Sequence, residues 1–292
     1  MNAPARLDRR SLREFPLPIA DEDGDKEDRG RLLVIGGSRE LAGAVLLAAL
    51  GGLRAGAGKL QVATAASIAI PLSVAIPEAR VIGCDEDGQG CLAPASGKVL
   101  RDLAREADAV TIGCGLQHGA PLDALLESLF ADPFDSTLVL DAAALGSLAP
   151  LKEALRGRKG SAILLPHSRE MARLLDCDHD VVVADPLAAV RHAASLYDAV
   201  AVIKGPCSYI AVPEGRAFRF EGGGIGLATS GSGDVLAGIV GGLCARGADA
   251  LTATLWGVYL HGESGRKLAK DVGRIGFLAR ELLDPIPGLL ER

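Results

Sequence analysis

A glycine-rich loop that contains a single acid, GLATSGSGDVLAG at residues 226–238, has the composition of an anion-binding site. Glycines permit unusual backbone angles and let a ligand approach the chain closely. An apolar helix predicted to begin near Asp234 would direct free N–H groups at the loop, and its dipole would favour a phosphate there. The sequence therefore predicts a phosphate site beside Asp234.

Asp234 itself has two interpretations that the local sequence leaves open. An ionised carboxylate beside a phosphate can take a proton from, or orient, a hydroxyl that is about to attack that phosphate. Aspartate is also a favourable N-cap, so the residue could serve only to begin the helix. The catalytic interpretation requires other elements of the fold to bring a cleft to this loop.

Short apolar strands alternate with helices along the chain, which is typical of a mostly parallel sheet covered by helices on both faces. The composition agrees, since 49% of the residues are hydrophobic but only 3% are aromatic. Strands are expected at 31–37, 59–64, 108–112, 137–141, 161–165 and 199–203, and a hairpin at 207–220. Helices are expected at 41–58, 97–106, 120–130, 150–156, 168–175 and 185–197, and from Asp234 to the end.

Ligands of such sheets bind outside the carboxyl ends of the strands. Polar or glycine-rich stretches follow five of the expected strands, which favours one continuous cleft along that edge. They are Gly36-Gly37-Ser38, Gly113-Cys114-Gly115, Asp141, Pro166-His167 with Glu170, and Lys204-Gly205. Neither G-x-G-x-x-G nor G-x-x-x-x-G-K-[ST] is present, so the loops do not match a dinucleotide fold or a P-loop.

The remaining composition narrows the class of protein. The net charge of −6 gives no sign of a nucleic-acid or anionic-membrane partner. Six widely spaced cysteines without a CxxC pair predict free thiols in a reducing cytoplasm. Residues 1–29 end in DEDGDKEDRG and are expected to be a flexible, charged lead-in, with a single domain over 30–292.

The ordered motifs resemble those of the ADP-dependent NAD(P)H-hydrate dehydratases, a family of the ribokinase-like superfamily. The resemblance covers about residues 30 to 290 and includes LLVIGGSRELAGAVLLAALGGLRAGAGKLQVAT, GCGL, LVLDAAAL, ILLPHSREMARLL, AVIKGPCSYIAVPEG, GLATSGSGDVLAG and LWGVYLHGESG. It implies a three-layer α/β sandwich. It also implies the stand-alone dehydratase, since the residues before the motifs are too few for the epimerase domain that often accompanies the family.

What the resemblance implies is repair of hydrated NADH and NADPH. The family dehydrates the S epimer at the expense of ADP, which gives AMP and phosphate and restores NAD(P)H. Phosphorylating the ring hydroxyl turns a poor leaving group into a good one, so a kinase-like fold can serve a lyase. Mg²⁺ as cofactor, ADP as co-substrate and a homo-oligomer are also implied.

The resemblance also assigns residues. Asp234 would be the base and would contact the hydrated nicotinamide, and Gly233 would lie against the nucleotide phosphates. Ala44, Gly115 and His167 match positions that line the hydrated-dinucleotide site. The segment that would cradle AMP matches the family's KGxxT, with serine in place of threonine: Lys204, Gly205, Pro206, Cys207 and Ser208.

Three departures from the family pattern stand out. The usual DADAL has become DAAAL, so Ala143 replaces an acid, and no metal ligand is assigned. Ser230 replaces a glycine and Leu165 a threonine. Two alternatives to the dehydratase therefore stay open: a ribokinase-like kinase for a vitamin precursor alcohol, which would release the phosphorylated alcohol, and a nucleotide-binding homologue with weak or no turnover. Glu170 is interpreted as a helix N-terminal acid.

Overall fold

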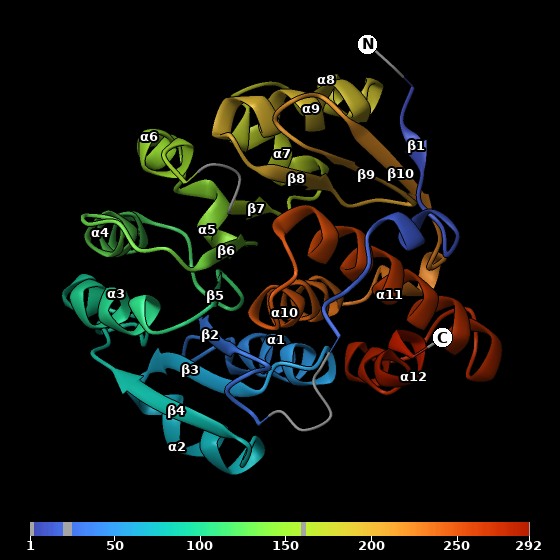
Figure 1. Cartoon of the computed structure of the whole chain (residues 1–292). Coiled ribbons are helices and arrows are strands. Elements are labelled where there is room, and N and C mark those ends of the chain that lie inside the picture. Colours follow the sequence, from blue (N-terminus) through green and yellow to red (C-terminus); the bar gives the residue numbers. More distant parts are fainter. Residues whose placement is uncertain (1–2, 20–24, 159–161, 292) are drawn as a thin grey trace.

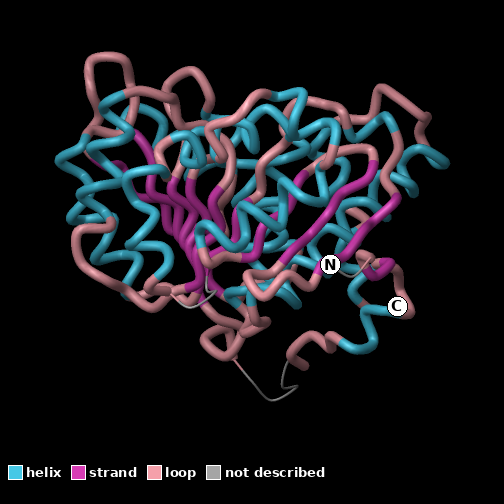
Figure 2. Tube along the Cα trace, turned by 90° about the horizontal axis from the view of Figure 1, so that it is seen from above, coloured by secondary structure: helices cyan, strands magenta, loops and turns pink. Residues whose placement is uncertain are grey.

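A computed structural model describes residues 3–19, 25–158 and 162–291. Its strands form one twisted layer between helices, as the view from above shows (Figure 2). The order across the sheet is β1-β10-β9-β8-β7-β6-β5-β2-β3-β4. The strands of the described residues are β1 (Ala5–Arg6), β2 (Arg31–Ile35), β3 (Lys59–Ala65), β4 (Ala79–Cys84), β5 (Ala109–Ile112), β6 (Thr137–Leu140), β7 (Ala162–Leu164), β8 (Val200–Ile203), β9 (Cys207–Ala211) and β10 (Ala217–Glu221).

The strand pairing confirms the expected α/β class with a mostly parallel sheet. From β4 to β8 every neighbouring pair is parallel, whereas β9 runs antiparallel to both β8 and β10. Because β2 to β8 share one direction, their carboxyl ends meet at one edge of the sheet. The expected hairpin is β9–β10, and β4 is a strand at the sheet edge that the sequence pattern did not predict.

Helices cover both faces of the sheet (Figure 1). Residues of β2 alternate between the two apolar clusters, with Leu32 and Val34 in one and Leu33 and Ile35 in the other. One face carries α1 (Ala42–Arg54), α10 (Ser232–Ala245), α11 (Ala250–Asp271) and α12 (Ile286–Leu290). The other carries α3 (Gly97–Arg105), α4 (Ala120–Leu129), α6 (Lys152–Arg156), α7 (Ser168–Leu174), α8 (His179–Ala184) and α9 (Pro186–Tyr197), while α2 (Ala66–Ala75) lies beside β4 and α5 (Ala143–Gly146) follows β6. Short 3-10 helices occupy Ser11–Glu14, Pro94–Ser96, Ala149–Leu151, Ile225–Leu227 and Ala279–Leu283.

Helices α1 and α10 cross with their backbones in contact, because small residues line both. A Cβ on Gly238 of α10 would lie 2.0 Å from the carbonyl oxygen of Ala48 in α1, and one on Gly242 would lie 2.4 Å from that of Gly52. No side chain fits at such distances. The contact fixes α10 along α1 and so fixes where the N-terminus of α10 points.

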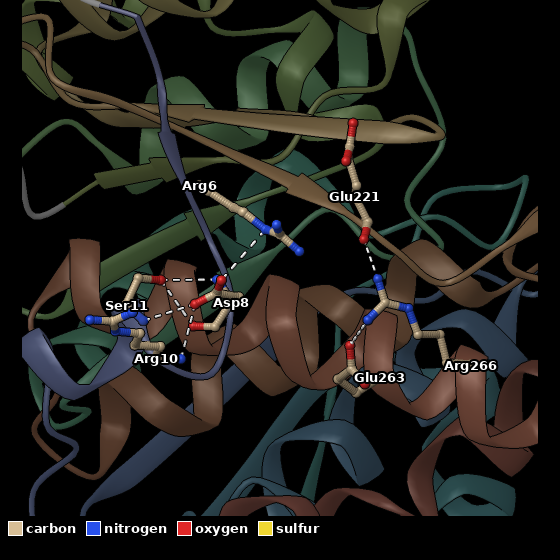
Figure 3. Close-up of polar contacts among 7 residues, drawn as sticks. All are labelled: Arg6, Asp8, Arg10, Ser11, Glu221, Glu263 and Arg266. Atoms are coloured by element: carbon tan, nitrogen blue, oxygen red, sulfur yellow. Dashed lines mark hydrogen bonds and ion pairs between the residues drawn. The ribbon is translucent and has the colours of Figure 1, made fainter.

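The N-terminal segment differs from the flexible lead-in expected over residues 1–29, because its described part packs against the domain. Leu7 and Leu12 are buried, and the indole Nε1 of Trp256 in α11 donates to the carbonyl of Phe15 over 2.7 Å. Asp8 accepts from the backbone N–H of Ser11 over 3.0 Å, and the Ser11 hydroxyl closes the same turn (Figure 3). Apolar residues within the charged segment therefore anchor it.

Beside that segment, Arg266 joins the end of β10 to α11 (Figure 3). Its guanidinium donates to the backbone carbonyl of Glu221 and to the carboxylate of Glu263.

The six cysteines, at 84, 91, 114, 177, 207 and 244, are free thiols, as their spacing predicted. Among the described residues, none of the helices combines the length and the apolarity that a membrane span requires.

The anchoring of the N-terminal segment can be tested with two variants in that segment. Leu12 is 1% exposed and Ile19 is 95% exposed. Leu12→Ala should lower the free energy of unfolding by about 2–4 kcal/mol, because it removes buried methyl groups and leaves a cavity. Ile19→Ala should change it by less than about 0.5 kcal/mol. Urea unfolding measures both, and equally small effects would show that the segment does not contribute to the core.

Candidate active site

Asp234 lies in the first turn of α10, at the carboxyl edge of the sheet. The residue at the N-cap position is Gly231, in the left-handed region with φ 88°, and the helix begins at Ser232. Asp234 is thus the third helical residue and does not cap α10, so the N-cap interpretation is wrong. Its carboxylate instead accepts a hydrogen bond from the Cys114 thiol and lies within reach of the helix dipole.

A buried ion pair stands opposite this helix terminus. The Lys204 ammonium, which follows β8, lies 2.6 Å from Oδ1 of Asp141, which follows β6. The side chains are 20% and 3% exposed, respectively. Burial acts against the charge on Lys204, but the carboxylates of Asp141 and Glu170 outweigh it and raise the lysine pKa. Lys204 is therefore an ammonium at neutral pH.

Gly233 brings the helix terminus and the ion pair together. A Cβ placed on Gly233 would lie 3.4 Å from Nζ of Lys204 and 3.6 Å from Oδ2 of Asp141. The space beside the missing side chain is thus bounded by the Lys204 ammonium, by the Asp141 carboxylate and by the N-terminus of α10. The ammonium and the helix N-terminus stabilise a phosphate. We call Asp141, Lys204, Gly233 and Asp234 the site cluster.

The pKa of Asp234 is raised to about 6 by its surroundings. Burial is the largest cause and the neighbouring Asp141 carboxylate the next, while a hydrogen bond from the Cys114 thiol and the Lys204 ammonium act in the opposite direction. A carboxylate with a pKa near 6 is ionised at neutral pH and is a stronger base than an ordinary aspartate. That is the property a general base requires.

Two glycine loops meet near Asp234 and bring two predicted residues together. The N–H of Gly37 donates to the carbonyl of Cys114 over 2.8 Å, which joins the loop after β2 to the loop after β5. Gly115 has φ 75°, and a Cβ there would lie 3.1 Å from Cβ of Ala44 and 2.5 Å from the carbonyl oxygen of Leu41. Ala44 and Gly115 are therefore neighbours at the carboxyl edge of the sheet.

His167 is the N-cap of α7 and forms a capping box with Glu170. Nδ1 of His167 accepts from the N–H groups of Arg169 and Glu170 over 3.1 and 3.2 Å, and Glu170 accepts from the His167 N–H over 2.8 Å. Accepting at Nδ1 places the proton of the neutral ring on Nε2, the ring nitrogen farther from the cap. Glu170 is a helix N-terminal acid, as predicted, and it also acts on Lys204.

The predicted nucleotide segment turns from β8 into β9 next to the site cluster. The Lys204 N–H donates to the carbonyl of Pro166 over 2.9 Å, which ties the segment to the His167 loop. Gly205 and Pro206 are exposed, and Cys207 and Ser208 open β9. The structure thus brings Lys204 to Gly233, while Ser208 lies further along the same edge of the cleft.

Three further residues surround the site. Ala142, between Asp141 and α5, has φ 50°, a strained angle for alanine. Ala143 is buried in the apolar cluster that also contains Leu33 and Ile35. His261 hydrogen-bonds the Ser232 hydroxyl over 2.9 Å, and burial lowers its pKa to about 4, so a neutral histidine supports the first turn of α10.

Asp141 lies at the end of an expected strand, but no role for it is predicted from the sequence. A signal for the pair was nevertheless present, because Asp141 ends the apolar strand TLVL and Lys204 ends the apolar strand VAVI. Opposite charges that each follow a fully buried strand need a partner. The two strands are separated only by β7 in the sheet, so the partners are each other.

Comparisons with known proteins place this site in a family. A family model described as NAD(P)H-hydrate dehydratase matches residues 32–288. The chain is 46% identical to the ADP-dependent (S)-NAD(P)H-hydrate dehydratase of Xanthomonas campestris, over 97% of this chain and 94% of that relative.

Solved structures agree. The ADP/ATP-dependent NAD(P)H-hydrate dehydratase from Bacillus subtilis, co-crystallised with ATP and Mg²⁺, is 29% identical with a TM-score of 0.84, over 100% of this chain and 99% of that one. A ribokinase-like superfamily protein from Enterococcus faecalis is 26% identical with a TM-score of 0.82, over 98% and 95% of the two chains. The expected ribokinase-like fold is confirmed.

The raised pKa of Asp234 predicts a pH-dependent effect of its removal on stability. The folded pKa of about 6 exceeds the ordinary value of 3.8, so the fold favours the protonated acid. This contribution to stability is fully present below pH 3.8 and is lost as the pH rises through 6. Asp234→Asn resembles the protonated acid, so at pH 7.5 it should raise the free energy of unfolding by about 1–3 kcal/mol.

Denaturant unfolding at pH 7.5 and pH 4 measures this effect, which should shrink to about 0.5 kcal/mol at the lower pH, close to the ordinary pKa of 3.8. Asp123→Asn is the matched control, because Asp123 is an exposed acid in the first turn of α4. It should change stability by less than about 0.5 kcal/mol at either pH. A loss of stability in Asp234→Asn that is the same at both pH values would contradict the raised pKa.

Proposed function

Because the chain belongs to the NAD(P)H-hydrate dehydratase family, we infer that it dehydrates the S epimer of hydrated NADH and NADPH at the expense of ADP. The observation that carries this assignment is the site cluster, in which a carboxylate with a raised pKa stands beside a lysine and a helix N-terminus. The reaction restores NAD(P)H and gives AMP and phosphate.

The site cluster accounts for the first step. Asp234 accepts the proton of the ring hydroxyl as the hydroxyl oxygen attacks the β-phosphorus of ADP, and AMP leaves with the electron pair of the broken bond. The ring carbon–oxygen bond then breaks with phosphate as the leaving group. Loss of a ring proton restores the double bond. The oxygen of the added water thereby leaves the ring as part of the phosphate, and cleavage of ADP supplies the driving force.

Each of the other residues has a place in this step. The Lys204 ammonium lies where it would neutralise charge on the transferred phosphate, and Gly233 leaves room for that phosphate at the helix N-terminus. Ser208 and the exposed turn before it would hold the AMP part. Ala44 and Gly115 would line the hydrated dinucleotide on the β5 side of Asp234, and His167, whose loop is tied to Lys204, would contact it from the β7 side.

We propose that Mg²⁺ assists the phosphates. The described residues contain no group of three or more acids, histidines or cysteines that could hold a metal. Mg²⁺ commonly binds through one or two carboxylates together with substrate phosphates, so the carboxylate of Asp141 fits a site completed by ADP. When bound, Mg²⁺ would neutralise phosphate charge. Ala143 is buried among apolar side chains and adds no ligand.

We further propose a cytoplasmic homo-oligomer. Six free thiols favour a reducing compartment. On α2, the side chains of Ile70 and Val74 are 76% and 78% exposed, and apolar helix faces of this kind are commonly buried between subunits.

Recovery of NADH from its S hydrate tests the function directly. Absorbance at the reduced-nicotinamide band should rise only when ADP or ATP is present, with AMP and phosphate formed in equal amounts when ADP is used. Asp234→Asn should lower kcat by roughly 10² or more without loss of AMP binding, because it removes the base but not the nucleotide site. In the wild type, kcat/KM should fall as the pH drops below about 6, because Asp234 becomes protonated.

Each contrary result has a separate meaning. Release of a stable phosphorylated ring alcohol without NADH recovery would indicate a kinase. AMP binding without either product would indicate a nucleotide-binding homologue. Near-normal turnover by Asp234→Asn would remove Asp234 from the catalytic step.

The nucleotide site predicts an effect of a side chain at Gly233. Gly233→Val should weaken ADP binding by roughly tenfold or more, about 1.4 kcal/mol, because the branched side chain would enter the space between the helix N-terminus and Lys204. Gly288→Val is the control, since Gly288 also lies in a helix and a Cβ there meets nothing within 4 Å. Isothermal titration calorimetry with AMP and ADP measures both variants. Unchanged affinity in folded Gly233→Val would place the phosphates elsewhere.

A further inference from the structure

A cavity of about 120 Å³ lies at the same edge of the sheet as the site cluster, towards β4. We call it the side cavity. Its floor is apolar and consists of four leucines, Leu92, Leu116, Leu122 and Leu125. Its rim carries polar groups of three kinds: the carboxylate of Asp87, the amides of Gln89 and Gln117, and the imidazole of His118.

The topology places the side cavity beside the predicted dinucleotide site. Its walls come from residues 85–93, which follow β4, from 113–118, which follow β5, and from α4. Both strands belong to the parallel part of the sheet, so both loops lie at the carboxyl edge. Leu116 directly follows Gly115, and the latter touches Ala44. A ligand that lies against Gly115 therefore needs to extend by only about two residues' length, roughly 7 Å, to reach Gln117.

Hydrogen bonds hold the walls of the side cavity in place. The Arg39 N–H donates to the carbonyl of Gly90 over 3.0 Å, and the Arg39 guanidinium pairs with Glu86 over 3.1 Å. The Gln117 amide lies 3.4 Å from both the Ser38 hydroxyl and the carboxylate of Glu40. Because these walls are already held in place, binding a ligand there costs less conformational entropy.

The strand order decides which ligand can reach the side cavity. The nucleotide segment, 204–208, follows β8, whereas the side cavity lies beyond β5, and Asp141 at the end of β6 stands between them. If ADP occupies the β8 side, a dinucleotide whose nicotinamide meets Asp234 must extend towards β5 and β4. The part of it farthest from the nicotinamide is the adenosine.

The chemistry of the side cavity suits an adenosine without a 2′-phosphate. Leucine side chains pack against the faces of a planar base, while amide, imidazole and carboxylate groups can meet its edge and the ribose hydroxyls. The charge around the rim is negative, since Asp87 and Glu40 are acids and the nearby Arg39 is paired with Glu86. In dinucleotide sites generally, an acid favours the ribose 2′-hydroxyl and an arginine the 2′-phosphate.

We propose that the side cavity binds the adenosine end of the hydrated dinucleotide and that Asp87 and Glu40 select hydrated NADH over hydrated NADPH. The proposal rests on the proposed function, because it assigns one end of that function's substrate. It makes Asp87 and Glu40 residues that determine specificity and gives them no part in the chemical step.

The test compares three S hydrates under saturating ADP: those of NADH, of NADPH, and of reduced nicotinamide mononucleotide, which lacks the adenosine. Wild-type kcat/KM should be at least tenfold higher for hydrated NADH than for hydrated NADPH. The double variant Glu40→Gln/Asp87→Asn should reduce that ratio at least threefold, chiefly through a lower KM for hydrated NADPH. Asparagine keeps the oxygen that accepts from the N–H groups of Gln89 and Cys91, each over 2.9 Å, so the loop should stay folded.

A second variant fills the side cavity. Leu122→Trp should raise KM for hydrated NADH about tenfold with little change in kcat, and so lower its kcat/KM relative to that of the mononucleotide hydrate. AMP affinity by calorimetry and the melting temperature check that this variant retains its nucleotide site and fold. Should it unfold, the comparison of wild type with the double variant decides alone.

The outcomes separate the two proposals. No recovery from any hydrate would defeat the proposed function. Recovery with equal kcat/KM for hydrated NADH and NADPH, and with no response to either variant, would leave the function standing and overturn the side cavity as the adenosine site. A wild type that prefers hydrated NADPH would also overturn the selection by Asp87 and Glu40.

Discussion

The ion pair of Lys204 and Asp141 is the interaction on which the rest of the active site depends. It joins the ends of β6 and β8 across β7, and each charge compensates the desolvation of the other. The same two groups act in opposite directions on Asp234, because the carboxylate raises its pKa and the ammonium lowers it. A single pair thus supplies a cation for the phosphate and, together with burial, tunes the basicity of Asp234.

Much of the site could be predicted from the sequence because its chemistry is concentrated in local motifs. The acid in the glycine-rich loop, the glycine before it and the lysine after β8 are all recognisable from short stretches. Parallel strands then require these stretches to meet at one edge, whatever their separation in sequence. The dehydratase assignment followed from the order of the motifs, and the family comparison confirms it.

What sequence reasoning missed depends on contacts between distant segments. The N-terminal segment looks solvated because charged residues surround its few leucines, yet Leu12 is buried and Phe15 contacts Phe218 of β10 and Trp256 of α11. Strand β4 is partly exposed at the sheet edge, so it lacks the uniform apolar pattern of the central strands. The sequence alone allows Asp234 to be an N-cap, because the first residue of α10 is fixed by the left-handed backbone angle of Gly231. That angle cannot be read from the sequence.

The contact between α1 and α10 has a consequence for how this protein can vary. Ala44 at the carboxyl edge of the sheet and Asp234 in the site cluster belong to these two helices, and Gly238 holds the helices at backbone contact. A methyl group at residue 238, one turn from Asp234, would therefore push the helix with the acid away from the helix that carries Ala44. Substitution of Gly238 is thus restricted by the spacing of the active-site residues as well as by folding. A larger residue at this position would require a compensating change on α1.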